Sequence, residues 1–165
     1  MLKKLRHPYI IDVEASGFGH DSYPIEIGIA LADDDKYCTL IKPQAEWTYW
    51  DQEAEKVHGI SLETLDKYGK PAELVADDLN QRLDGLTLFT DGWVVDKPWI
   101  SKLFDSVNKP MHFQISPLER ILAEEQMEKW HDTKDEIIKN SDLQRHRASN
   151  DAWIIQQTYK RTLQD

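Results

Sequence analysis

Two acidic side chains, Asp12 and Glu14, end an apolar segment near the start of the chain, YIIDVE over residues 9–14. Side chains on a β-strand alternate between the two faces of the sheet, so a strand over residues 9–14 places both carboxylates on the same face. Adjacent carboxylates repel each other, and the repulsion is relieved at a solvated strand end or by a divalent cation bound to their oxygens. The spacing therefore makes this strand end a candidate metal site.

Two further acids and one histidine complete a set that suits phosphoryl hydrolysis. Asp96 follows an expected strand over residues 86–90, and Asp151 stands in the first turn of the expected last helix, with His146 five residues before it. The helix dipole stabilises an acid in a first turn, which is the simpler explanation for Asp151 alone. Taken together, four carboxylates and a histidine at strand and helix ends predict a site that binds two divalent cations, Mg²⁺ or Mn²⁺, and cleaves phosphodiesters.

The predicted mechanism follows from charge. Phosphodiester cleavage develops negative charge on the attacking and leaving oxygens, and two cations about 4 Å apart stabilise both. The charges of four carboxylates and two divalent cations cancel, so the filled site accepts a phosphate. His146 is the expected general base because an unperturbed histidine has a pKa of about 6.5. The alternative is a solvated surface histidine beside Arg145 and Arg147, which are themselves either phosphate contacts or solvated loop residues.

Composition limits the fold and the partners. The 165 residues, 40% of them hydrophobic, predict a single domain over residues 1–165. A formal net charge of −10 leaves no broad basic face for gripping long duplex nucleic acid. The single Cys38 forms no intramolecular disulfide, which favours a reducing compartment, and the cytoplasm is the expected location. Residues 1–6 are basic but precede only a short apolar run, so neither a signal peptide nor a membrane helix is expected.

Alternating apolar residues predict the strands. The expected strands cover residues 9–14, 25–31, 37–41, 86–90 and 112–115. Residues 15–23 contain two glycines and are expected to form a loop, and the three aspartates at 33–35 are expected at a solvated hairpin tip. Cys38 is expected to pack in the third strand as a small apolar residue.

Capping residues and periodicity predict the first helices. Asp51 opens a short helix that ends at Val57, Ser61 caps a second helix, and a third helix covers residues 72–83. The aromatic residues of segment 47–50 either stack on nucleic-acid bases or pack over the core, and packing is favoured.

The second half of the chain is expected to be mainly helical. Segment 91–96 leads from a strand into a helix, and residues 116–119 (Ser-Pro-Leu-Glu) have the spacing of a helix capping box. The polar stretch 132–142 is expected to be partly loop, and Ser149 is the expected cap of the last helix.

The chain resembles the DEDDh (DnaQ-like) branch of the DEDD superfamily of 3′–5′ exonucleases, which includes the proofreading subunit of bacterial DNA polymerase III. The first family motif is matched by IDVE at residues 11–14, followed by Ser-Gly-Phe at 16–18. The third motif is matched by His-Arg-Ala at 146–148 and by Asp151, with the spacing between histidine and acid that this branch has. VHGI at residues 57–60 matches a segment frequently found ahead of the second motif.

This resemblance, which spans nearly the whole chain, implies an α/β fold of the ribonuclease H-like class. That fold has a five-stranded mixed sheet with strand 2 antiparallel and helices on both faces. The implied activity is hydrolysis at the 3′ end of single-stranded DNA or RNA, or of a short oligonucleotide. The implied metal ligands are Asp12, Glu14, Asp96 and Asp151, with His146 as the base.

The resemblance also implies substrate contacts after the first strand. The backbone of Ala15, Ser16 and Gly17 is expected near the terminal 3′-hydroxyl, Phe18 is expected to wedge against the terminal base, and His58 is expected to line the same pocket. From the residues alone, Phe18 as a core side chain and His58 as an ordinary residue at a helix C-terminus stay open as alternatives.

The middle motif departs from the family pattern, because residues 91–96 read DGWVVD where the family has His-Asn, two variable residues and Phe before its acid. Ala15 also replaces the usual threonine. The metal ligands are therefore retained while the substrate-positioning residues are altered. Two alternatives stay open: an inactive relative that binds nucleic acid or another partner, and a hydrolase acting on nucleotides. No membrane association is expected, and whether the chain forms a homo-oligomer is left open.

Overall fold

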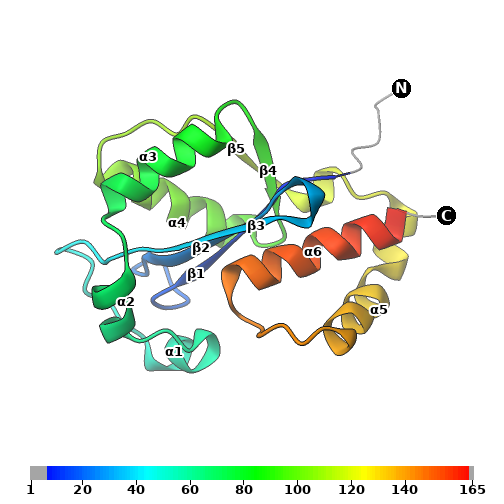
Figure 1. Ribbon diagram of the computed structural model, residues 1–165, viewed down its shortest axis with the longest axis horizontal. Coiled ribbons are helices and arrows are strands. Elements are labelled where there is room, and N and C mark those ends of the chain that lie inside the picture. The colour runs from blue at the N-terminus through cyan, green and yellow to red at the C-terminus, as the bar shows by residue number, and fades with distance from the viewer. Residues whose placement is uncertain (1–6, 164–165) are drawn as a thin grey trace.

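A five-stranded sheet with strand order β3-β2-β1-β4-β5 forms the centre of the computed structural model, which describes residues 7–163 (Figure 1). Its strands are β1 (Ile10–Ala15), β2 (Pro24–Ala30), β3 (Lys36–Leu40), β4 (Thr87–Thr90) and β5 (Gln114–Pro117). Strand β2 is antiparallel to both of its neighbours, whereas β4 is parallel to β1 and β5. The expected mixed sheet with an antiparallel second strand is confirmed. The basic segment 1–6 lies outside the described residues.

Helices cover both faces of this sheet, as expected (Figure 1). The helices are α1 (Gln52–His58), α2 (Leu62–Tyr68), α3 (Ala72–Leu83), α4 (Trp93–Ser106), α5 (Glu124–Asn140) and α6 (Ala148–Leu163). Side chains of β1 alternate between two cores: Ile11 and Val13 pack with α3 and α4, whereas Ile10 packs with α6. Asp12 and Glu14 share the parity of Ile10 and therefore face α6.

The predicted caps of the first two helices are confirmed. The side chain of Asp51 accepts a hydrogen bond of 2.8 Å from the backbone N–H of Glu53, and the hydroxyl of Ser61 accepts one of 3.1 Å from Thr64. These acceptors satisfy N–H groups that have no partner within the helix. Helix α1 runs one residue further than expected, to His58.

The aromatic group before α1 mostly packs, as favoured. Trp47 is buried and stacks on Tyr23 with ring centroids 5.4 Å apart, and Trp50 meets His58 edge to face. Tyr49 is the exception, since its ring is exposed. The segment thereby closes the core over the end of the sheet where β1 finishes.

Two expectations about β-structure are wrong. Cys38 is exposed rather than packed; it lies on the edge strand β3, paired with Gly28 of β2. The capping-box spacing at residues 116–119 begins no α-helix: Ser116 and Pro117 end β5 in pairing with β4, and a single 3₁₀ turn, Leu118–Arg120, follows. Strand pairing therefore overrides the local capping signal.

Of two expectations about the last helices, one holds only for residues 141–142 and the other is wrong. The polar stretch 132–142 is mostly helix, because α5 continues to Asn140 and buries Ile137. Ser149 does not cap α6, which already begins at Ala148; the N–H of Ala148 donates instead to the carboxylate of Glu26 on β2. Across residues 7–163 every helix is too short or too polar to cross a bilayer.

Candidate active site

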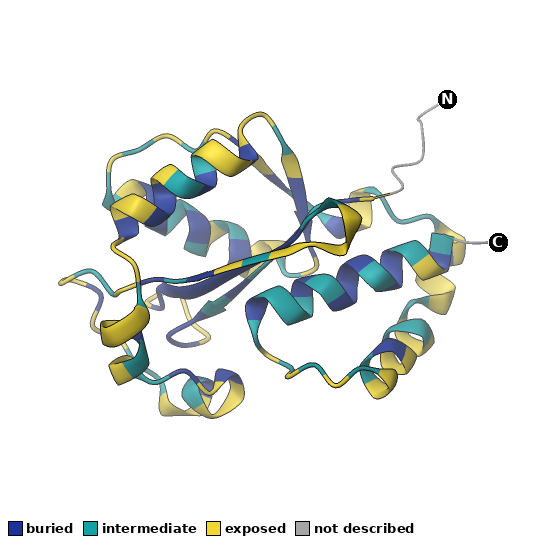
Figure 2. Ribbon diagram, in the orientation of Figure 1, coloured by how far each residue is buried: buried dark blue, intermediate teal, exposed yellow. Residues whose placement is uncertain are grey.

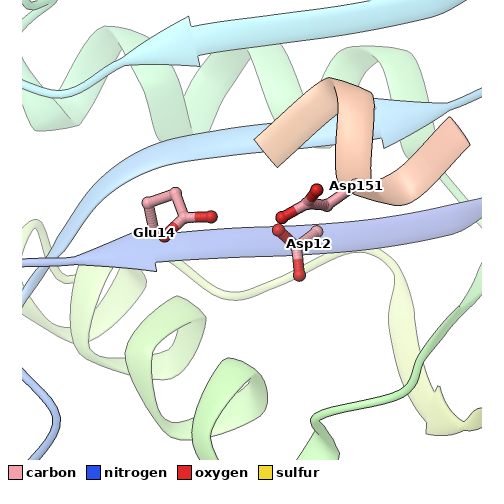
Figure 3. Close-up of side chains that lie close together, drawn as sticks. All are labelled: Asp12, Glu14 and Asp151. Carbon is pink, nitrogen blue, oxygen red and sulfur yellow. The ribbon is translucent and has the colours of Figure 1, made fainter. Parts of the chain in front are cut away.

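Three carboxylates meet where β1 runs beneath the first turn of α6 (Figure 3). Asp12 and Glu14 come from the same face of β1, and Asp151 comes from α6. Each contributes one oxygen, and these oxygens all lie within 4.8 Å of one another. We call these three residues the acid cluster. Closely spaced carboxylate oxygens are the ligands that Mg²⁺ and Mn²⁺ prefer.

Burial and mutual repulsion raise the pKa values of the strand acids. Burial raises the pKa of Glu14 to about 8, with further contributions from the charges of Asp151, Glu26 and Asp96. Burial also raises the pKa of Asp12 well above its ordinary value, and the charge of Asp96 is the next largest cause. The cluster thus holds more negative charge than its surroundings neutralise. A divalent cation removes this excess, so the acid cluster can hold a metal ion.

The fourth predicted acid, Asp96, lies beside the cluster in the first turn of α4. Its side chain is buried and accepts a hydrogen bond of 2.6 Å from the hydroxyl of Thr90, the last residue of β4. Burial raises the pKa of Asp96 to about 7, although the Thr90 hydroxyl opposes this effect. Asp96 is not part of the compact group of three that residues 7–163 form, but its charge acts strongly on Asp12.

His146 stands at the open side of the acid cluster. Its Nδ1 lies 4.0 Å from an oxygen of Asp151, and its side chain is half exposed. The backbone at His146 has a positive φ of 59°, and its N–H donates a hydrogen bond of 3.2 Å to Asp151. Arg145 also donates to this carboxylate, through Nε at 3.0 Å. Two consecutive residues of the loop before α6 therefore donate hydrogen bonds to the side chain of Asp151.

A pocket of about 60 Å³ lies next to the acid cluster and shares Glu14 with it. The loop after β1 forms part of its wall. Four of the five predicted substrate contacts line it: Ala15, Gly17, Phe18 and His58. We call it the loop pocket. The fifth residue, Ser16, is buried away from it, and its hydroxyl accepts a hydrogen bond of 3.1 Å from the N–H of Tyr23.

Phe18 and His58 differ in how they line the loop pocket. Phe18 is 62% exposed, which excludes the alternative that it is a core side chain. His58 is buried at the end of α1, and its Nδ1 accepts a hydrogen bond of 3.0 Å from the N–H of Ile60. The proton of the neutral ring therefore sits on Nε2, and the ring donates a hydrogen bond toward the backbone of Ala15. Burial lowers the pKa of His58, so the ring is neutral near pH 7.

No family model and no curated protein sequence matches this chain. Solved structures do match it. The zinc-bound complex of Escherichia coli exonuclease I with single-stranded DNA is 11% identical, with a TM-score of 0.69 over 92% of this chain. The same enzyme with a dA16 oligonucleotide is 10% identical, with a TM-score of 0.69 over 94%. Exonuclease I from Methylocaldum szegediense is 11% identical, with a TM-score of 0.58 over 76%.

The chain has the ribonuclease H-like fold of exonuclease I. It spans 39% and 40% of the two E. coli chains and 30% of the M. szegediense chain. The structural match agrees at the level of fold with the family resemblance in the sequence. The assignment of site residues rests on the geometry of this chain.

Two residues near the acid cluster were not predicted as site residues. Asp91 and Lys134 line a shallow pocket of about 60 Å³ together with Asp12, Arg145 and Asp151. Asp91 directly follows β4, and the carboxyl ends of parallel strands meet at one edge of a sheet, so its position could have been inferred. Lys134 could not, because it falls in the stretch expected to be partly loop.

Proposed function

We propose that this chain is a metal-dependent 3′–5′ exonuclease that hydrolyses phosphodiester bonds at the 3′ end of single-stranded DNA or RNA. One observation carries this proposal: oxygens of three half-buried carboxylates lie within 4.8 Å of one another, and His146 stands next to them. The shared fold supports it, since matched structures of exonuclease I are complexes with single-stranded DNA.

Asp12, Glu14 and Asp151 would hold the cations, with Asp96 completing the ligand set. Bound divalent cations supply charge stabilisation to the attacking and leaving oxygens and lower the pKa of water. The protein supplies the fixed positions of the carboxylates, which stand on a strand and two helix starts. The neighbouring Thr90 hydroxyl fixes the rotamer of Asp96 through its hydrogen bond.

His146 is placed to remove the proton of the attacking water. Its Nδ1 faces Asp151 at 4.0 Å, which leaves Nε2 to take the proton. Because the side chain is half exposed, that proton can then pass to solvent.

The loop pocket is placed to receive the terminal nucleotide. Its wall lies directly beside Glu14, and the exposed ring of Phe18 offers a face for base stacking. The buried ring of His58 lines the same pocket. With a net charge of −10, the chain has few basic contacts for a longer strand, so recognition is confined to a few nucleotides.

A product time course on 3′- and 5′-labelled DNA and RNA oligomers, with Mg²⁺ or Mn²⁺, tests the proposal. Stepwise release of mononucleotides from the 3′ end is expected, and chelation of the metal should stop it. Internal cuts, or release from the 5′ end, would overturn the polarity. Oligomer binding without cleavage under any metal would instead indicate a binding module, and cleavage of mononucleotides alone would indicate a nucleotide hydrolase.

A further inference from the structure

A buried glutamate on β2 fastens the first turn of α6 to the sheet. Glu26 is 2% exposed, and its carboxylate accepts four hydrogen bonds from the start of that helix. The guanidinium of Arg147 donates through Nε to both oxygens, at 3.2 and 3.1 Å, and through Nη2 at 2.7 Å. The backbone N–H of Ala148 donates at 2.7 Å. One carboxylate thus both caps the helix and pairs with the residue before it.

The next residue on the same face of β2 is a glycine, and it is needed there. A Cβ at Gly28 would lie 2.0 Å from the backbone nitrogen of Ser149 and 2.1 Å from the carbonyl carbon of Ala148. The helix backbone therefore rests directly on the strand, which no side chain at position 28 permits. Glu26 grips the helix start, and Gly28 sets its distance from the sheet.

Hydrogen bonds link this attachment to the site residues. The carbonyl of Arg147 accepts from the N–H of Asp151 at 3.0 Å, which begins the helix. The carboxylate of Asp151 in turn accepts from the N–H of His146 at 3.2 Å. A shift of Arg147 would therefore move both Asp151 and His146 relative to β1.

Placing a negative charge at position 26 costs electrostatic energy, and capping the helix does not by itself require a charged residue. Glu26 pairs directly with Glu14 across the β1–β2 ladder, so two carboxylates face each other on one side of the sheet. Like charges in this position are destabilising, and a neutral serine, threonine or asparagine is an equally good cap. What a carboxylate adds is the forked, two-oxygen pairing with arginine, which fixes direction as well as distance.

We propose that Glu26, Gly28 and Arg147 form a positioning clamp that holds Asp151 and His146 in register with Asp12 and Glu14. This inference rests on the proposed nuclease function. The clamp residues touch neither metal nor substrate; they act through the helix start. Misplacement of reacting groups by about 1 Å costs roughly 10²-fold in rate, so a loosened clamp lowers turnover more than substrate binding.

The experiment compares the full chain with Glu26→Gln, which keeps the size of the side chain but removes its charge, and with Arg147→Lys, which keeps the positive charge but removes the guanidinium fork. We expect kcat to fall about 10- to 100-fold with KM nearly unchanged, and Mn²⁺ affinity, measured by calorimetry, to fall with it. Because the two residues act as one unit, the double variant should lose no more than the worse single variant. Gly28→Ala should lose as much or more, by lifting the helix.

Gln126→Leu provides the matched control at the other end of α6. Gln126 is also buried, and its amide donates to the carbonyl of Tyr159 and the hydroxyl of Thr162, so its loss lowers the melting temperature without touching the first turn. Its kcat should equal that of the parent. If kcat falls equally in Gln126→Leu and Glu26→Gln, the effect of Glu26 is one of general stability, and the inference is overturned.

The outcomes separate this inference from the proposed function. An active parent with an equally active Glu26→Gln variant overturns the clamp and leaves the nuclease assignment intact. An inactive parent that still binds Mn²⁺ overturns the assignment, and the loss of Mn²⁺ affinity in Glu26→Gln then still supports the clamp. A parent that neither cleaves nor binds Mn²⁺ overturns both.

Discussion

The acid cluster and the loop pocket adjoin at Glu14, but they are built differently. Asp12, Glu14 and Asp151 stand on a strand and a helix start that are packed on both sides, and the surroundings of the cluster are mostly buried or half-buried (Figure 2). The loop pocket depends on the loop after β1, where Phe18 is 62% exposed. The difference teaches that the carboxylates of this site are held by regular, packed elements, whereas the side chain proposed to contact the base stands exposed on a loop.

The largest effect is expected from removing one carboxylate of the acid cluster. Asp12→Asn keeps the shape of the side chain and should reduce cleavage to the assay background, because it removes a ligand and a negative charge from the cluster. The control Asp66→Asn removes an exposed acid that pairs with Lys42 and should cleave at the parent rate. Cleavage by Asp12→Asn at the parent rate would remove the acid cluster from the mechanism.

Replacing the base should cost less, because the cations remain. His146→Ala is expected to lose about 10²- to 10⁴-fold in kcat, as general acid–base groups do, while Mn²⁺ affinity stays unchanged. His131→Ala, which removes an exposed histidine from α5, serves as the control. Unchanged turnover in His146→Ala would return His146 to the role of a surface residue.

The same contrast explains what the sequence could predict. Asp12, Glu14 and Asp151 were predicted from alternation and motif spacing because regular elements convert spacing into direction. The cap of α6 could not be predicted in this way, because Glu26 lies 122 residues before Ala148. A local rule selected Ser149 instead. The one hint was a charged residue within the otherwise apolar strand PIEIGIA, all of which is buried.

Other failures have the same physical origin in tertiary packing. The polar stretch 132–142 has only two apolar residues, Ile137 and Ile138, and it is helical as far as Asn140 because α5 packs along α6. Cys38 lies exposed on the edge strand β3, and strand order cannot be read from one strand. Local signals succeeded for Asp51 and Ser61, whose partners lie within three residues.

The exposed half of the site should respond in binding rather than in chemistry. Phe18→Ala should raise KM for an oligonucleotide by about 10-fold, since stacking of one base on an aromatic ring contributes roughly 1–3 kcal/mol. Its kcat should change little. Tyr68→Ala, which removes an equally exposed ring from α2, should leave KM unchanged. A loss of kcat in Phe18→Ala with an unchanged KM would show that the loop positions the reacting groups.

The length of the nucleic-acid substrate should affect kcat/KM even less. If recognition is confined to the loop pocket and the acid cluster, a four-nucleotide and a thirty-nucleotide strand should be cleaved with similar kcat/KM, and salt should affect both weakly. Each neutralised phosphate on a single strand contributes a slope of about −0.7 in log K against log salt. A strong preference for the longer strand with a steep slope would reveal an extended basic track.

The smallest expected effect is on stability of the metal-free protein, and it follows from Glu14. Its pKa is raised from 4.5 to about 8, so between these values the folded chain binds a proton that the unfolded chain has released. Stability is therefore highest below the unfolded pKa and falls as pH rises through the folded pKa. Between pH 6 and pH 7 the melting temperature should drop by about 2–4 °C, which corresponds to roughly 1 kcal/mol for a chain of this size. Saturating Mg²⁺ should flatten this slope by neutralising the cluster, and Glu14→Gln should reduce it without metal, while the raised pKa values of Asp12 and Asp96 leave the rest of it. If the metal-free protein instead becomes more stable over this pH range, the negative charge of the acid cluster is already neutralised by other residues, for example by Arg145.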